Sequence, residues 1–346
     1  MKALKLAALV LWVVIGSVAC RAHSPQAFLS SVVPPATASA EVVAVAEAPP
    51  LVAAVPERSL RECALGRGAA TPILSREDAT TPKRVALTFD DGPHKSFTPG
   101  VLSALRSHEL KATFFLVGRS INGQSYKLVQ RMVAEGHTIA IHSYNHEVEM
   151  ATRFARAKSE AYIVGQWEVT RMLIDIALVA TSEQDFDAAF ARVFAVAPYD
   201  WITEEMLAND VATFAERHRA LLAERGFVDG ARPIDVIFWR PPGGGPYLGK
   251  DIGEARKTYD RALLSLGVIN VIWHGGSGDT DALRRRDRGF LLGNLRHATR
   301  AGGVLLMHDG IDKVALASGL LQMKTDGVEV VSLETLAREK LCPAAQ

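Results

Sequence analysis

The sequence predicts an α/β protein built on a parallel β-sheet, either a barrel or an open doubly wound sheet. From residue 84 onward, short apolar segments of strand length alternate with amphipathic segments of helical period. This alternation is typical of parallel sheets whose strands are joined by helices. With 346 residues, 48% of them hydrophobic, the chain can bury a substantial core.

The predicted elements follow one another along the chain. "RVALTF", which begins at Arg84, predicts a buried strand, and the next helix has Thr98 as its N-cap and Pro99 in its first turn. A second helix begins at Tyr126 and is closed by Gly136. Further strands are predicted at 111–118, 138–143, 234–240, 266–274, 302–309 and 328–333, with a helix at 288–301.

The N-terminal segment predicts export. Lysines precede an apolar run that is too short for a membrane span, and small residues precede Cys20, so residues 1–22 are expected to form a signal peptide. Cys20 is a candidate lipidation site of a bacterial lipoprotein, and ordinary cleavage after Ala19 is the alternative. Residues 23–60, rich in Ala and Pro, predict a linker. We therefore expect the folded domain, 61–346, in the bacterial cell envelope or outside the cell.

Two further cysteines, Cys63 and Cys342, flank the predicted domain. An exported protein meets an oxidising compartment, where such an even pair predicts a disulfide. Because pairing cannot be deduced from sequence, two unrelated thiols are the alternative.

The composition limits the partners of the chain. Its formal net charge is +1, whereas a basic domain would show a clustered excess of Lys and Arg, so we expect no binding to nucleic acid. Contact with a membrane is expected only through a lipid on Cys20. The protein is expected to be a monomer.

Polar residues stand where the predicted strands end. In a parallel barrel, sites are assembled from separate loops at the edge where the strands end, which we call the rim. His142 and His146 are four residues apart, a spacing that allows two imidazoles to bind one metal ion, and an Asp oxygen would complete a site of catalytic zinc type. The residues at the rim are Asp90, Asp91, His142, His146, Arg240, Asp279 and His308.

These residues belong to five short motifs between about residues 84 and 336, namely "TFDDGP", "ATFFLVG", "GHTIAIHSYNH", "WRPPGG" and "LLMHD". In this order the motifs resemble a known family, the polysaccharide deacetylases, whose shared core is the NodB homology domain. The resemblance implies an irregular (β/α) barrel. It also implies metal-dependent removal of N- or O-acetyl groups from an acetylated glycan polymer.

The resemblance assigns a role to each matching residue. Asp91, His142 and His146 would bind a divalent ion, zinc or alternatively cobalt or nickel. Asp90 would be the general base and His308 the general acid. Arg240 would pair with Asp90, and Asp279 would orient His308.

Two motifs depart from the family pattern. Gly243 replaces the usual aromatic residue, so an oxyanion contact would rest on its backbone N–H, with Pro242 and Leu306 as neighbouring substrate contacts. In "WHGGSGDTD", Gly276 and Thr280 replace the usual Asp and Trp, and Asp279 remains. These changes would affect how His308 is oriented and one wall of the groove that binds the glycan.

Compared with the family, the chain is longer between His146 and Arg240, which predicts a helical insertion at about 155–230. Tyr199 and Trp201 could belong to a cap that shapes a sugar groove. The plainer interpretation is a packing insertion whose aromatic residues are core.

Two other functions are compatible with these residues. The same metal, base and acid would serve the hydrolysis of a non-sugar amide. Alternatively, the altered "WHGGSGDTD" stretch could belong to a catalytically silent glycan-binding or scaffold protein.

Overall fold

The structure is a computed structural model that describes residues 58–66, 74, 78–248 and 253–342. The predicted signal peptide, Cys20 and residues 23–57 of the predicted linker lie outside the described residues. The described part forms one compact unit.

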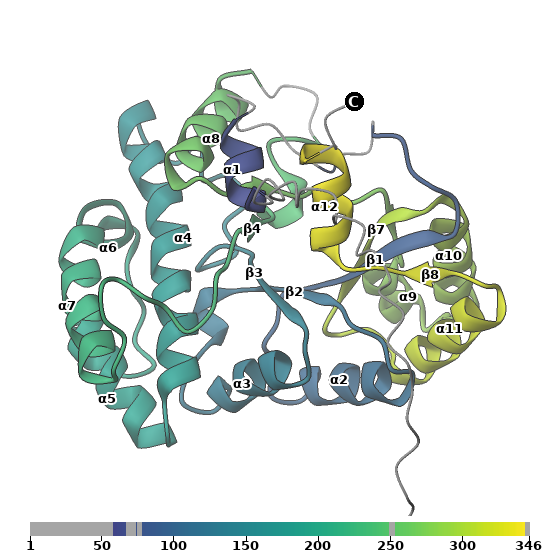
Figure 1. The fold of residues 1–346 in the computed structure, drawn as a ribbon, viewed down its shortest axis with the longest axis horizontal. Helices are drawn as coiled ribbons and strands as arrows, with labels where there is room; N and C mark the ends of the chain where they lie inside the picture. Colours follow the sequence, from purple (N-terminus) through teal and green to yellow (C-terminus); the bar gives the residue numbers. More distant parts are fainter. Residues whose placement is uncertain (1–57, 67–73, 75–77, 249–252, 343–346) are drawn as a thin grey trace, which may run out of the picture. The chain divides into compact units, whose positions relative to one another are not determined.

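A single sheet of eight parallel strands forms the centre of this unit (Figure 1). Its strand order is β5-β4-β3-β2-β1-β7-β6, and β8 pairs with the first two residues of β1. The strands are β1 (Arg84–Asp90), β2 (Thr113–Leu116), β3 (Thr138–Ile141), β4 (Phe238–Trp239), β5 (Ile269–Asn270), β6 (Gly275–Gly276), β7 (Gly303–His308) and β8 (Glu329–Val330).

The sheet is curled into an irregular (β/α) barrel. Its two outermost strands, β5 and β6, are consecutive in the sequence and are joined by residues 271–274 alone. An extended connection of this length spans roughly 17 Å at most. The two ends of the sheet must therefore approach each other, and the expected barrel is the fold observed.

Helices cover the outside of the curled sheet, where one large apolar cluster lies between sheet and helices. No helix among the described residues is both long and apolar enough to cross a membrane. The helices of this layer are α2 (Thr98–Ser107), α3 (Tyr126–Ala134), α8 (Gly253–Leu266), α9 (Asp279–Arg285), α10 (Arg288–Ala301) and α11 (Lys313–Thr325).

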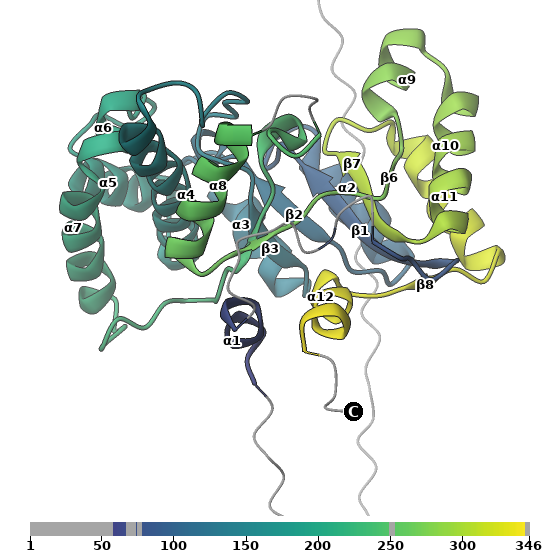
Figure 2. The ribbon, with the colours of Figure 1, turned by 90° about the horizontal axis from the view of Figure 1, so that it is seen from above.

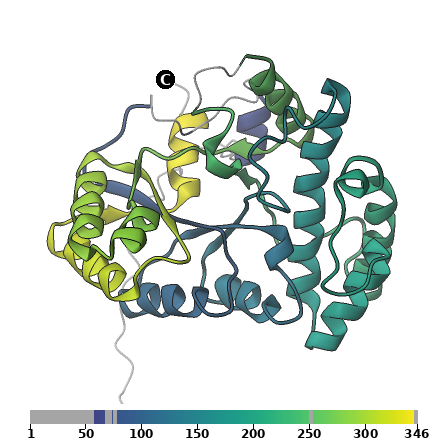
Figure 3. The same cartoon turned by 180° about the vertical axis from the view of Figure 1, so that it is seen from behind.

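Four helices lie between β3 and β4, in the region of the predicted insertion. The long helix α4 packs against α3, α6, α7 and α8, and Figure 3 shows α5 to α7 outside α4, away from the sheet. Their bounds are α4 (Arg156–Val179), α5 (Glu183–Phe194), α6 (Glu204–Asn209) and α7 (Val211–Glu224).

Two further helices, α1 (Leu60–Leu65) and α12 (Leu333–Leu341), close the amino end of the barrel. They pack on a second, smaller apolar cluster that includes Ala86 and Val304, near the starts of β1 and β7. Arg61 of α1 donates hydrogen bonds to the carbonyls of Leu266 and Gly267, just before β5. Figure 2 shows both helices on the side of the sheet opposite α9. We call α1 and α12 the plug.

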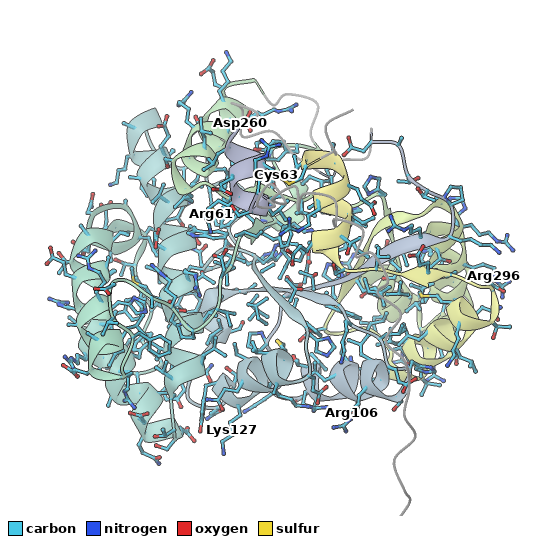
Figure 4. All side chains as sticks on the ribbon, in the orientation of Figure 1. Arg61, Cys63, Arg106, Lys127, Asp260 and Arg296 are labelled. Carbon is cyan, nitrogen blue, oxygen red and sulfur yellow. A yellow bond between two sulfur atoms is a disulfide. The ribbon has the colours of Figure 1, made fainter. Side chains whose placement is uncertain are left out.

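A disulfide joins the two helices of the plug. Cys63 and Cys342 are bonded, with their Cα atoms 5.5 Å apart, and Figure 4 labels Cys63 on α1 beside α12. The bond connects residues 279 positions apart in the sequence. It therefore ties the two ends of the described unit to each other.

Some local predictions were wrong. Phe97, not Thr98, is the N-cap of α2, and the hydroxyl of Thr98 accepts a hydrogen bond from the His94 N–H (2.7 Å) and donates one to Asp309. Strands β4 and β5 are two residues long, shorter than the segments 234–240 and 266–274 predicted for them. Neither β6 nor α9 was predicted, since "GGSGDTD" has no apolar period.

Candidate metal centre and catalytic site

The predicted base and acid lie side by side on neighbouring strands. Asp90 of β1 and His308 of β7 are register partners, so their side chains point to the same face of the sheet. The Asp309 N–H also donates a hydrogen bond to the Asp90 carbonyl. The last residues of β1 and β7 thus form one edge of the site. This site lies at the rim, the carboxyl end of the barrel.

Asp91 lies beside Asp90, yet its side chain reaches the same site. Neighbouring side chains of an extended strand point to opposite faces, but the strand ends at Asp90 and Asp91 has the left-handed φ of 75°. The segment 142–146, which we call the histidine loop, follows β3. Its residues Ser143 and His146 also have positive φ, 69° and 62°. Such conformations cost free energy in non-glycine residues and are concentrated at functional sites.

Asp91, His142 and His146 form a cluster that fits a divalent metal ion. Oδ1 of Asp91 lies 3.2 Å from Nε2 of His146 and 3.6 Å from Nε2 of His142, and the three ligand atoms lie within 4.8 Å of one another. Metal–ligand bonds of about 2.0–2.2 Å place two ligands of one ion roughly 3.0–3.5 Å apart. The donor set matches the one predicted from the sequence.

The environment of His142 prepares it for metal binding. Its Nδ1 lies 2.8 Å from the carbonyl of Arg240, which can only accept a hydrogen bond. Nδ1 therefore carries the proton, and the lone pair of Nε2 faces Asp91. Burial lowers the pKa of His142, which favours the neutral imidazole that binds metals.

The carboxylate of Asp91 is held in its charged form. Its partial burial would raise the pKa, but the hydrogen bond from His146 and the charges of the neighbouring histidines outweigh it and lower the pKa of Asp91 to about 2. The carboxylate is therefore anionic over the physiological pH range, the form that suits a divalent cation.

Asp90 is held by a buried ion pair. Its Oδ1 accepts a hydrogen bond of 2.6 Å from Nη1 of Arg240, and both residues are at most 2% exposed. Oδ2 of Asp90 faces the residue cluster of Asp91, His142 and His146, which we call the metal cluster, and lies 3.6 Å from Nε2 of His142. The guanidinium also lies over the ring of Phe115, 4.0 Å from its centre. One oxygen of Asp90 is thus fixed, and the other points at the site.

His308 forms a second pair with Asp279 at the start of α9. Oδ1 of Asp279 lies 2.9 Å from Nδ1 of His308, and its Oδ2 accepts a hydrogen bond of 2.7 Å from the His308 N–H. Burial would lower the pKa of His308, but this hydrogen bond and the charges of Asp279, Asp90 and Asp91 raise it to about 9. The imidazole is therefore protonated at neutral pH.

The predicted substrate contacts also lie at the rim. Gly243 is in the short turn η2 (Pro242–Gly244), just after Arg240, and has a left-handed φ of 62°. A Cβ atom there would lie 3.6 Å from Val148, an ordinary contact. Leu306 precedes His308 by two residues on β7 and faces the same side of the sheet. Their roles in binding the substrate and oxyanion stay predictions.

Two supporting residues were not predicted. Thr88 accepts a hydrogen bond of 2.9 Å from Nη1 of Arg240; it precedes Asp90 by two residues, so strand alternation could have identified it. Gln166 of α4 accepts hydrogen bonds from the N–H groups of Tyr144 and Asn145, and so holds the histidine loop. No pattern in the sequence links α4 to this loop.

Comparison with known proteins gives consistent results. A family model described as polysaccharide deacetylase matches residues 77–174. The chain is 41% identical over 275 residues to a peptidoglycan-N-acetylglucosamine deacetylase of Bacillus cereus, covering 78% of this chain and 95% of that protein. A second protein of this description from Bacillus cereus is 51% identical over 259 residues, with 73% and 67% covered.

A peptidoglycan-N-acetylglucosamine deacetylase of Listeria monocytogenes is 29% identical over 266 residues, which make up 76% of this chain. The match spans 41% of the length of the Listeria protein.

Proposed function

The chain belongs to the polysaccharide deacetylase family, and from this premise we propose that it hydrolyses the acetamido groups of N-acetylglucosamine units in a polysaccharide. One observation carries the proposal. The cluster of Asp91, His142 and His146 is flanked by a carboxylate paired with arginine and by an imidazole paired with a carboxylate. Amide hydrolysis needs a base on one side of the scissile bond and an acid on the other.

Asp91, His142 and His146 would hold the metal ion. When bound, a divalent ion would polarise the acetyl carbonyl and make the attacking water more acidic. Two imidazoles and one carboxylate suit zinc, and cobalt or nickel would also bind them. The residues of this chain then supply the proton transfers.

Asp90 is the base of the proposed reaction. Its Oδ2 accepts a proton from the water whose oxygen forms the new bond to the acetyl carbon. The 2.6 Å hydrogen bond from Arg240 keeps the carboxylate oriented. The Gly243 N–H is a candidate donor to the carbonyl oxygen as negative charge develops there.

His308 is the acid of the proposed reaction. It donates its Nε2 proton to the sugar nitrogen as the C–N bond breaks, so that acetate and a free amine are released. Asp279 fixes the opposite ring nitrogen, 2.9 Å away, and stabilises the protonated ring before the proton is transferred.

The site of action in this proposal is the bacterial cell envelope. The predicted signal at 1–22 and the candidate lipid at Cys20 support export, and a disulfide between Cys63 and Cys342 suits an oxidising compartment. Metabolic labelling with a fatty acid in a strain that expresses the wild-type chain or Cys20→Ala tests the anchor.

The activity is tested by measuring acetate release from a panel of N-acetylated and O-acetylated glycans, with zinc, cobalt or nickel added to the chelated protein. We expect release from N-acetylated glycans that depends on the added metal. Release from simple acetamides but from no glycan would instead support a non-sugar amidase, and no release from any substrate would contradict the proposal.

A further inference from the structure

A cavity of about 530 Å³ lies beside the metal cluster and includes none of the residues assigned above. One wall is the segment Pro93–Lys95, which begins two residues after Asp91, and another is η1 (Gly118–Ser120), which follows β2. Both segments come from carboxyl ends of strands, so the cavity opens at the rim. The other lining residues come mostly from the segment 121–125, from α5 and from residues 198–201.

Hydrogen bonds connect this cavity to the histidine loop. The N–H groups of Gly118 and Arg119 donate to the carbonyls of Ser143 and Tyr144, at 2.9 and 2.8 Å. The hydroxyl of Tyr144 accepts a hydrogen bond of 3.0 Å from the N–H of Ile202. Since Tyr144 stands between the two metal-binding histidines, the loop that presents them also positions the cavity walls.

The cavity carries two exposed aromatic side chains. Tyr199 is 52% and Trp201 61% exposed, whereas Phe186 and Phe190 of the same region are buried. The interpretation of these two residues as core is therefore wrong. Exposed apolar groups that lie together and are rimmed by polar residues are typical of ligand-binding grooves.

The two aromatic residues are held in place without being covered. The guanidinium of Arg119 lies 5.0 Å from the centre of the Trp201 ring, so it supports one face of the indole. The hydroxyl of Tyr199 donates a hydrogen bond of 2.9 Å to Glu183, and the residue has a left-handed φ of 69°. A strained backbone that presents an aromatic ring to solvent indicates a functional constraint.

The charges around the cavity favour a neutral ligand. Two cations, Lys95 and Arg119, are balanced by Asp187 and Asp200. Planar amide groups add hydrogen-bonding capacity, since Gln124 accepts a hydrogen bond of 3.2 Å from Lys95 and Asn122 also lines the wall. Polar groups around an aromatic platform suit a pyranose ring, which has both apolar faces and hydroxyl edges.

We propose that this cavity is a subsite for a neutral saccharide unit, which stacks on Trp201 while another unit of the same polymer presents its acetyl group to the metal cluster. The identity of the polymer rests on the proposed function; the saccharide subsite does not. The subsite would make the protein prefer oligomers to a single saccharide, because one unit at Asp91, His142 and His146 would leave the cavity empty.

The test measures binding and turnover separately for the N-acetylglucosamine monomer and its hexamer. Calorimetry on the full chain, freed of metal by chelation, compares the wild type with Trp201→Ala. Truncation of an aromatic anchor should weaken binding of the hexamer by about tenfold. Trp201→Phe should retain most of the affinity, and Leu321→Ala, at an equally exposed position on α11 (56%), should retain all of it.

In metal-loaded protein, kcat/KM for the hexamer should fall by the same factor in Trp201→Ala, and kcat/KM for the monomer should stay unchanged. Equal hexamer binding by the wild type and Trp201→Ala would overturn the subsite. Binding that depends on Trp201 without any acetate release would support the subsite and contradict the proposed deacetylase activity.

Discussion

The two ends of the barrel differ in how their residues contribute to stability and to function. At the rim, charged groups are buried, Asp91 and His146 have left-handed backbones, and polar atoms converge on a small volume. At the plug, α1 and α12 bury apolar side chains and are joined by a disulfide. Buried charges and strained backbones at the rim lower the stability of the fold but place the groups needed for catalysis. The apolar contacts and the disulfide at the plug stabilise the fold. Changes at the rim should therefore alter turnover, and changes at the plug should alter unfolding.

The largest effect is expected at Asp90. Asp90→Asn should reduce kcat by about 10²–10⁴-fold, because the substituted amide cannot accept the proton of water. The carbonyl oxygen of that amide can still accept the hydrogen bond from Arg240, so the metal content by elemental analysis should stay at the wild-type level. Asp91→Ala is the contrasting variant and should lose metal. Equal loss of metal in both variants would show that the two aspartates do not have separate roles.

The plug offers the matching experiment on stability. Replacing Cys63 and Cys342 together by Ala removes a cross-link between residues 279 positions apart, which should lower the free energy of unfolding by about 4–5 kcal/mol. Denaturant titration measures this change. Activity per folded molecule should be retained, because the plug and the rim lie at opposite ends. A variant of unchanged stability but reduced kcat would break the distinction between the two ends.

A smaller effect at the rim concerns the proton on His308. Its pKa is raised to about 9, above the ordinary value of 6.5, chiefly because Asp279 overcomes the effect of burial. The stabilisation from the protonated ring is therefore complete below pH 6.5 and is lost as the pH rises through about 9. Asp279→Asn should lower this pKa, as NMR titration of the metal-free protein would measure.

In the active enzyme, the same substitution should move the alkaline limb of the kcat profile to lower pH. His308→Ala should remove that limb together with most of the turnover. An unchanged limb in Asp279→Asn would mean that another group sets it.

The smallest effect is expected at the start of the plug. Ser59 caps α1: its hydroxyl accepts a hydrogen bond from the Glu62 N–H (3.2 Å), and Glu62 accepts one from the Ser59 N–H. Ser59→Ala should lower the free energy of unfolding by about 1 kcal/mol, measured by denaturant titration. Turnover should not change. Ser59→Asp provides the control, because aspartate can also accept the cap hydrogen bond.

The sequence predicts the rim better than it predicts the surroundings. The seven polar residues were identifiable because parallel strands end at one edge and short motifs mark those ends. The left-handed backbone of Asp91 was not predicted, because Asp adopts that φ only occasionally and no local pattern requires it here. Exposure of Trp201 depends on how α5 and the histidine loop pack, and local patterns contain no such information.

The chain enters the described unit at the plug, where α1 begins next to α12 and Arg338 donates a hydrogen bond to the Arg58 carbonyl. A tether upstream of Arg58 would thus attach to the base of the barrel and leave its mouth directed away from the point of attachment. With the tether at the end of the barrel opposite the rim, the membrane anchor would not block the approach of the glycan to the site.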